Sequence, residues 1–324
     1  MSKGKILNLF IILGFFAAFL VYFYYNLEDF EILTSIKPEY ILLNALLQTS
    51  LIVANAFFLI VILKSFNLSI KTKDGIYISV LTTIGNYFTP FKGGMGIRAV
   101  YLKKKYKLSY TKFLSSLAGN YILIFFINSI VALCGTAILL SQGKHIATSL
   151  ILIFLGLFLS LLIIIVFPVP TGLLKKIQVP LVDKFISRVI LVIDGWNIIS
   201  RDWKTLSRLM FLTFITIPLT LLLYIIEFKS LGIEISFLNV LLFSSISSIA
   251  FLISITPGSL GIKEAILILF QTTLLLDTSE ILAVSIIDRV VTFFVMIMLW
   301  VVIKLYKSNI LNSRNTKKTN DKKN

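Results

Sequence analysis

Charged side chains lie inside or beside long apolar stretches of this chain, where a charge is costly and usually has a partner or a function. Asp288 and Arg289 interrupt an apolar run at 281–303. Lys263 and Glu264 follow a Pro-Gly motif at 257–258, and Arg98 follows a glycine-rich motif at 93–96. Arg and Lys in such places bind phosphate or carboxylate, Arg through two parallel hydrogen bonds. The pattern predicts recognition of an anionic group.

Each of these charges also has a structural explanation. Asp288 and Arg289 can form an ion pair, and Glu264 can favour the positive N-terminal end of a helix. Orientation of the chain in a membrane is by itself a sufficient explanation for Arg98 and the nearby Lys92. The sequence contains no paired carboxylates, no Ser/His/Asp set and no metal-ligand spacing. We therefore expect no catalytic residues, no metal and no cofactor.

The composition indicates an integral membrane protein. Of 324 residues 57% are hydrophobic and 14% are charged, against about 25% charged in an average soluble domain. The net charge is +16, which alone suits nucleic-acid binding. Here the basic residues lie in short loops between apolar runs, so we expect them to orient the chain in the bilayer and expect no nucleic-acid partner.

Transmembrane helices need about 20 apolar residues. Seven runs of about that length occur, at 6–25, 40–63, 113–140, 146–167, 209–226, 235–256 and 281–303. They predict an all-α, polytopic membrane domain over 1–308, followed by a disordered basic tail at 309–324. Apolar and charged residues alternate at helical spacing over 180–206, which predicts an amphipathic helix on the cytoplasmic surface.

The basic loops predict a multi-pass protein of the cell membrane with both termini in the cytoplasm. The alternate loops are acidic, and Glu227 and Glu234 fall in one that we expect outside. A single crossing at 75–91 would put seven basic residues outside. The chain is therefore expected to turn back at Pro90 and the glycines after it. A second hairpin is expected at Pro257, entering from the opposite side.

The two hairpins resemble each other in sequence. Each reads Thr-Pro, then a glycine-rich stretch, then Gly-Ile and a basic residue, and each is followed by a helix with a Phe-Phe pair. The offset between equivalent residues stays between 165 and 168. This indicates an inverted repeat with halves around 75–140 and 237–303, an architecture found in alternating-access transporters. Helix N-termini at the glycines favour an anion at the hairpin tips.

The candidate substrate-binding residues, taken as contacts for a lipid head group, come from both hairpins and the last helix. They are Asn86, Pro90, Lys92, Gly93, Gly96, Arg98, Pro257, Gly258, Gly261, Lys263, Glu264, Asp288 and Arg289.

These motifs resemble a known family. Asn86-x-x-x-Pro90, Arg98 and Pro257-Gly-x-x-Gly-x-x-Glu264 are similar to the lysylphosphatidylglycerol synthase transmembrane region. The resemblance implies a flippase-like membrane domain. In full-length synthases a separate soluble domain transfers the amino acid, and we expect that activity to be missing here. Asn120-Tyr121 stands where the family often has an acidic-Arg pair, which Asp288-Arg289 keeps in the second half.

The leading functional hypothesis is a lipid translocase that moves an anionic or aminoacylated phospholipid, or a polyprenyl-linked carrier, across the bilayer. One alternative is a secondary transporter of a small polar solute. Another is an accessory subunit for a separate synthase or glycosyltransferase. The expected partners are membrane lipids with anionic head groups.

Overall fold

The computed structural model describes residues 36–172, 183–250, 252–253 and 255–320. The predicted span at 6–25 lies outside these residues. The described part is helical and contains no strand. Its α-helices are α2 (Pro38–Lys64), α3 (Thr72–Phe88), α4 (Gly93–Tyr106), α5 (Tyr110–Ser141), α6 (Thr148–Val166), α8 (Asp183–Arg201), α9 (Trp203–Ser230), α10 (Phe237–Ile249), α11 (Ile262–Leu269), α12 (Gln271–Leu274) and α13 (Thr278–Asn320).

Five of the described helices are long and apolar enough to cross a membrane, namely α2, α5, α6, α9 and the 278–302 part of α13. In α6 only 11% of the most apolar window is buried inside the protein. Its remaining apolar side chains face outward, as expected of a helix in contact with lipid. The structure therefore confirms an all-α membrane protein.

Two of the predicted helices have different bounds in the structure, and the last helix extends beyond its predicted span. The run at 235–256 forms only the 13-residue helix α10, because the chain turns at Ala250 to enter the second hairpin tip. The helix expected over 180–206 ends at Arg201, since the Asp202 side chain caps a new helix, α9. Its residues 180–182 lie outside the described part. Finally, α13 runs as a helix to Asn320, into the tail expected to be disordered, and contains no Pro or Gly.

The first hairpin consists of α3, a short 3-10 turn η2 (Pro90–Lys92) and α4. Its two arms cross at Gly85 and Gly94, where a Cβ on Gly85 would lie 2.5 Å from the Cα of Gly94. Only two glycines allow backbones to approach this closely. At the open end Asp74 on α3 accepts hydrogen bonds from Lys105 and Tyr106 on α4, which ties the arms together.

The second hairpin repeats the local conformation of the first. It consists of α10, a 3-10 turn η3 (Pro257–Ser259) and the short helices α11 and α12. Phe91 and Lys92 have φ of 53° and 50°, and Gly258 and Ser259, 167 positions later, have φ of 57° and 55°. Two successive residues in the left-handed region are unusual. The sequence repeat is thus also a repeat of backbone geometry.

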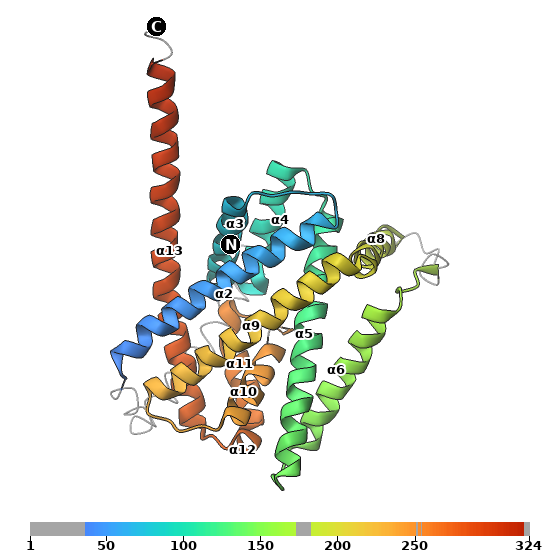
Figure 1. Cartoon of the computed structure of the whole chain (residues 1–324), viewed down its shortest axis with the longest axis vertical. Helices are drawn as coiled ribbons and strands as arrows, with labels where there is room; N and C mark the ends of the chain where they lie inside the picture. The colour runs from blue at the N-terminus through green and yellow to red at the C-terminus, as the bar shows by residue number, and fades with distance from the viewer. Residues whose placement is uncertain (1–35, 173–182, 251, 254, 321–324) are drawn as a thin grey trace, which may run out of the picture.

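The hairpins open toward opposite ends of the molecule and their tips meet in the middle (Figure 1). Two long helices, α2 and α9, run antiparallel beside them, with the start of α2 next to the end of α9, where the Lys37 amide donates to the Ser230 carbonyl. On the other side α8 packs against α5 and buries Trp196 and Ile199. This arrangement brings α5, α9 and α13 against the second hairpin and α2, α5 and α13 against the first.

Candidate functional site

The two hairpin tips contact each other through backbone groups. The amide of Phe91 donates to the carbonyl of Ile255 over 3.2 Å. The hydroxyl of Tyr87, on α3, donates to the carbonyl of Arg289, on α13, over 2.9 Å. These hydrogen bonds join the first repeat to the second at the level where the helices of both hairpins are interrupted. Any relative movement of the repeats must change them.

In the second repeat, Lys263 on α11 pairs with Asp288 on α13. The Lys263 Nζ lies 2.7 Å from Asp288 Oδ2, and the two side chains are 11% and 25% exposed. The amide nitrogen of Gln48, on α2, lies 3.4 Å from both Oδ1 and the carbonyl of Asp288. The ring of Tyr224, on α9, lies 5.1 Å from the ammonium group. Four helices therefore meet around one ion pair.

Arg289 fixes the tip of the second hairpin. Its Nη2 lies 2.6 Å and its Nε 3.2 Å from Glu264 Oε1, while Nη1 donates to the Gly258 carbonyl over 3.2 Å. The other oxygen of Glu264 accepts the amide of Gly261 over 2.8 Å, which closes the first turn of α11. Glu264 is therefore both a helix cap and an ion-pair partner. Asp288 and Arg289 do not pair with each other, because Asp288 pairs with Lys263 and Arg289 with Glu264, both on α11. Glu264 does lie at a helix N-terminus, as its structural explanation requires.

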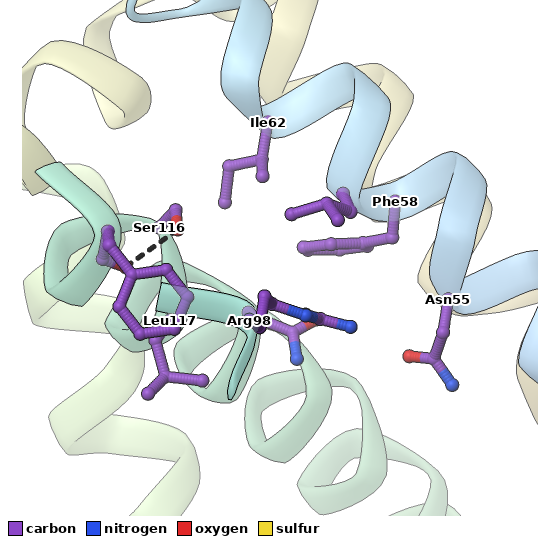
Figure 2. Close-up of a pocket in the computed structure, with 9 residues that line it drawn as sticks. Asn55, Phe58, Ile62, Arg98, Ser116 and Leu117 are labelled. Atoms are coloured by element: carbon purple, nitrogen blue, oxygen red, sulfur yellow. Dashed lines mark hydrogen bonds between the residues drawn. The ribbon is translucent and has the colours of Figure 1, made fainter. Parts of the chain in front are cut away.

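In the first repeat, Arg98 lies in the second turn of α4 and points into a small pocket between α2, α4 and α5 (Figure 2). Its Nε donates to the hydroxyl of Thr82 over 3.0 Å. In the described part of the chain, no carboxylate lies within 4 Å of its guanidinium. The pocket is lined by Asn55, Phe58, Leu59, Ile62, Phe113, Ser116, Leu117 and Asn120 besides Arg98. The guanidinium thus faces amides, a hydroxyl and apolar groups.

Arg98 and Asn120 occupy the places that Lys263 and Asp288 occupy in the second repeat. The offsets are 165 and 168, within the range of the repeat. The second repeat joins its cation and its acid in an ion pair, whereas the first places its cation in a pocket with a neutral amide. The cation of the second repeat is therefore neutralised by an acid of its own repeat, whereas the guanidinium of Arg98 has no such acid among the described residues.

Lys92, at the first tip, contacts Tyr121 on α5. Its Nζ lies 2.7 Å from the hydroxyl and 4.5 Å from the ring centroid. Tyr121 stands 168 positions before Arg289, so the residue equivalent to Arg289 again binds the tip of its own hairpin. The structure therefore places Lys92 in a contact that holds the tip to α5.

The tip glycines differ in their surroundings. A Cβ on Gly93 would lie 2.3 Å from the Thr89 hydroxyl, and one on Gly94 would lie 2.0 Å from the Thr82 carbonyl and 2.7 Å from Asn86 Oδ1. Nothing lies within 4 Å of such an atom on Gly96. The crossing thus depends on Gly94, which was not among the candidate residues, together with Gly85.

The thirteen candidate residues fall into two groups rather than one site. Those of the second half lie at the second tip, around the ion pairs Lys263–Asp288 and Arg289–Glu264. Those of the first half divide between the tip, at Pro90 and Lys92, and the Arg98 pocket on the α2 side of α4. Asn86 lies on α3 at the crossing, with its Oδ1 buried and without a partner among the described residues. Within the described part, no group of His, Cys, Asp or Glu could hold a metal ion.

Sequence reasoning missed the contribution of α2 and misplaced one acid. Asn44 and Gln48 contact Glu227 and Asp288, but two amides in an apolar run give no signal of a partner. Glu227 does not lie in an outer loop, because α9 continues to Ser230 and buries this side chain completely. The apolar residue Phe228, which follows it, is the only local sign that the helix continues.

These features define a membrane protein built on two broken helical hairpins with ionised groups in its interior. Residues 6–299 match the family model of the lysylphosphatidylglycerol synthase TM region. The chain therefore belongs to the lysylphosphatidylglycerol synthase TM region family, as the motifs indicate. Searches of curated proteins and of solved structures found no match.

Proposed function

We propose that this protein is a lipid translocase that binds an anionic lipid head group at Arg98 and moves the lipid between the leaflets of the cell membrane. Family membership supports a role in lipid handling. It concerns a membrane region rather than a catalytic domain, and we accordingly propose transport rather than catalysis. The substrate classes that suit a phosphate-binding site are anionic or aminoacylated phospholipids and polyprenyl-linked carriers.

The observation that carries this proposal is the guanidinium of Arg98. It stands in a pocket without an acid, although its counterpart Lys263 has one. A partly buried charge without an acid beside it is costly. Arg presents donors in a fork that matches phosphate oxygens. A head-group phosphate in the pocket would supply the missing negative charge. Phe58 and Leu59 of α2 form the apolar side of the pocket.

The test compares two conservative changes in vesicles that contain a fluorescent phosphatidylglycerol. Arg98→Lys keeps the charge but loses the fork, so we expect transfer between leaflets to slow about tenfold. Lys104→Gln removes a charge from an exposed position on the same helix and should leave the rate unchanged. Equal rates for Arg98→Lys and the parent protein, at equal incorporation, would contradict head-group recognition by Arg98.

The same vesicles test the alternatives. Uptake of a small polar solute without movement of the fluorescent lipid would favour a secondary transporter. If neither lipid nor solute moves, an accessory subunit that binds a separate synthase or glycosyltransferase becomes the better explanation.

A further inference from the structure

Helix α2, which packs against α9 and α13, carries two amide side chains one turn apart. Asn44 and Gln48 are four residues apart on α2 and share one face. Gln48 reaches Asp288, as described above, and the Asn44 Nδ2 donates to Glu227 Oε1 over 3.0 Å. Glu227 is 0% exposed and belongs neither to an ion pair nor to the Arg98 pocket. It is a buried acid for which lipid binding at Arg98 gives no role.

Two oxygen atoms of this pair are buried and have no hydrogen-bond partner among the described residues. They are Oε2 of Glu227 and Oδ1 of Asn44. An ionised carboxylate and an amide oxygen are both acceptors, so neither can satisfy the other. A protonated carboxyl group changes this, because its O–H is a donor. A proton on Oε2 turns this atom into a donor, and the buried Oδ1 of Asn44, whose Nδ2 already donates to Oε1, is an acceptor without a partner among the described residues.

We propose that Glu227 is a proton-binding site, protonated in this conformation and ionised in another, which couples lipid movement to the movement of protons. This inference rests on the proposed translocase function. The step is a proton transfer alone: the carboxylate takes a proton from water on one side of the membrane and releases it to water on the other. No covalent bond is made or broken apart from the O–H bond.

The surroundings of Glu227 provide the coupling. The charged and titratable groups within electrostatic reach are Lys263 on α11, Asp288 on α13 and Tyr224 on α9 itself. The other helices packed there present the amide of Asn44, from α2, and the phenyl ring of Phe243, from α10. Lys263 is therefore the only cation among these groups in the described part of the chain.

Ionisation of Glu227 changes which carboxylate groups attract the ammonium group of Lys263. While Glu227 is neutral, Lys263 pairs with Asp288 and holds α11 to α13. Once Glu227 is ionised, two carboxylates attract one ammonium group, and the pair with Asp288 is weakened. The second hairpin is then less firmly attached to α13. A proton on one acid thus controls a contact between moving parts of the repeat.

Infrared spectroscopy tests the protonation state without any transport. Parent protein in phosphatidylcholine vesicles at neutral pH should show the carbonyl band of a protonated carboxylic acid. Glu227→Gln should lose that band, and Glu39→Gln, at an exposed acid in the first turn of α2, should keep it. A band that survives in Glu227→Gln overturns the proposal. If Glu227→Gln does not fold, Asn44→Leu should shift the band by removing its hydrogen bond, and an unshifted band overturns the proposal equally.

Coupling is tested in vesicles with fluorescent phosphatidylglycerol and the membrane potential held at zero. For one proton per lipid, a gradient of one pH unit should shift the leaflet distribution up to about tenfold. Glu227→Gln should leave the distribution even while transfer continues, and Glu39→Gln should respond like the parent. A parent distribution that ignores the gradient overturns the coupling. Absence of any lipid transfer, with the infrared band present, contradicts the translocase function and leaves the proton site supported.

Discussion

The ammonium group of Lys263 lies 2.7 Å from the carboxylate of Asp288, an ion pair that joins the second hairpin to the last helix. The first repeat has Arg98 and Asn120 at the corresponding positions and cannot form it. A partly buried ion pair adds little net stability, because the cost of removing two charges from water offsets their attraction. We interpret the difference as a division of roles, in which the second repeat holds the tip in place and the first receives the ligand.

Restoring the acid in the first repeat should convert it into a copy of the second. Asn120→Asp places a carboxylate in the pocket of Arg98, where it can pair with the guanidinium. We expect lipid transfer to fall at least about tenfold, because substrate phosphate must then displace an internal acid. Asn120→Leu removes the amide without adding a charge and should be much less harmful. Equal loss in both variants, measured in the fluorescent lipid assay, would show that charge is not the cause.

The glycines of the first hairpin should differ sharply in their tolerance of a methyl group. Gly94→Ala brings a Cβ to 2.0 Å from the Thr82 carbonyl, so the arms must separate, and we expect a loss of about 2–4 kcal/mol or failure to fold. Gly96→Ala meets nothing within 4 Å and should be neutral or stabilise the helix by up to about 1 kcal/mol. Thermal unfolding in detergent measures both. Similar midpoints for the two variants would contradict the crossing.

The sequence predicted the hairpins because proline, glycine and basic residues follow general rules for helix breaks and membrane orientation. It could not choose the partners of the charges. Whether Asp288 pairs with Arg289 or with Lys263 depends on which face of α13 meets α11, and this is decided by packing between helices far apart in the chain. The same limit applies to Glu227, since a charge usually marks the end of a membrane helix, and its hydrogen bond with Asn44 on α2 joins residues 183 positions apart.

The start of α9 provides a pH-dependent contribution outside the membrane-spanning helices. Hydrogen bonds from the hydroxyl and amide of Thr205 hold the pKa of Asp202 below its usual value. A lowered carboxyl pKa stabilises the fold above the unfolded pKa of about 3.9 and loses this contribution as the pH falls through the lower, folded value. Because Asp202 is exposed, the effect should stay under about 1 kcal/mol.

Two substitutions separate the charge of Asp202 from its capping role. Asp202→Asn keeps a good cap and should approach the parent in stability as the pH falls below about 4. Asp202→Ala should be less stable than Asp202→Asn by about 1 kcal/mol at every pH. Detergent unfolding midpoints between pH 3 and 7 measure both differences. A constant gap between the parent and Asp202→Asn across this range would rule out the lowered pKa.

Arg289 should be irreplaceable by lysine even though the charge is kept. Its guanidinium contacts Glu264 through two nitrogens and the Gly258 carbonyl through the third. Lysine can make only part of this set from a single atom, so Arg289→Lys should cost about 1–3 kcal/mol and loosen the second tip.

The matched control is Lys229→Arg, near the end of α9 and away from both tips. A cysteine introduced at Leu260, beside the tip, reports the loosening: it should react faster with a thiol reagent in Arg289→Lys than in the parent, with Cys134 replaced by serine in both. Unchanged labelling and an unchanged unfolding midpoint would mean that Arg289 does not hold the tip.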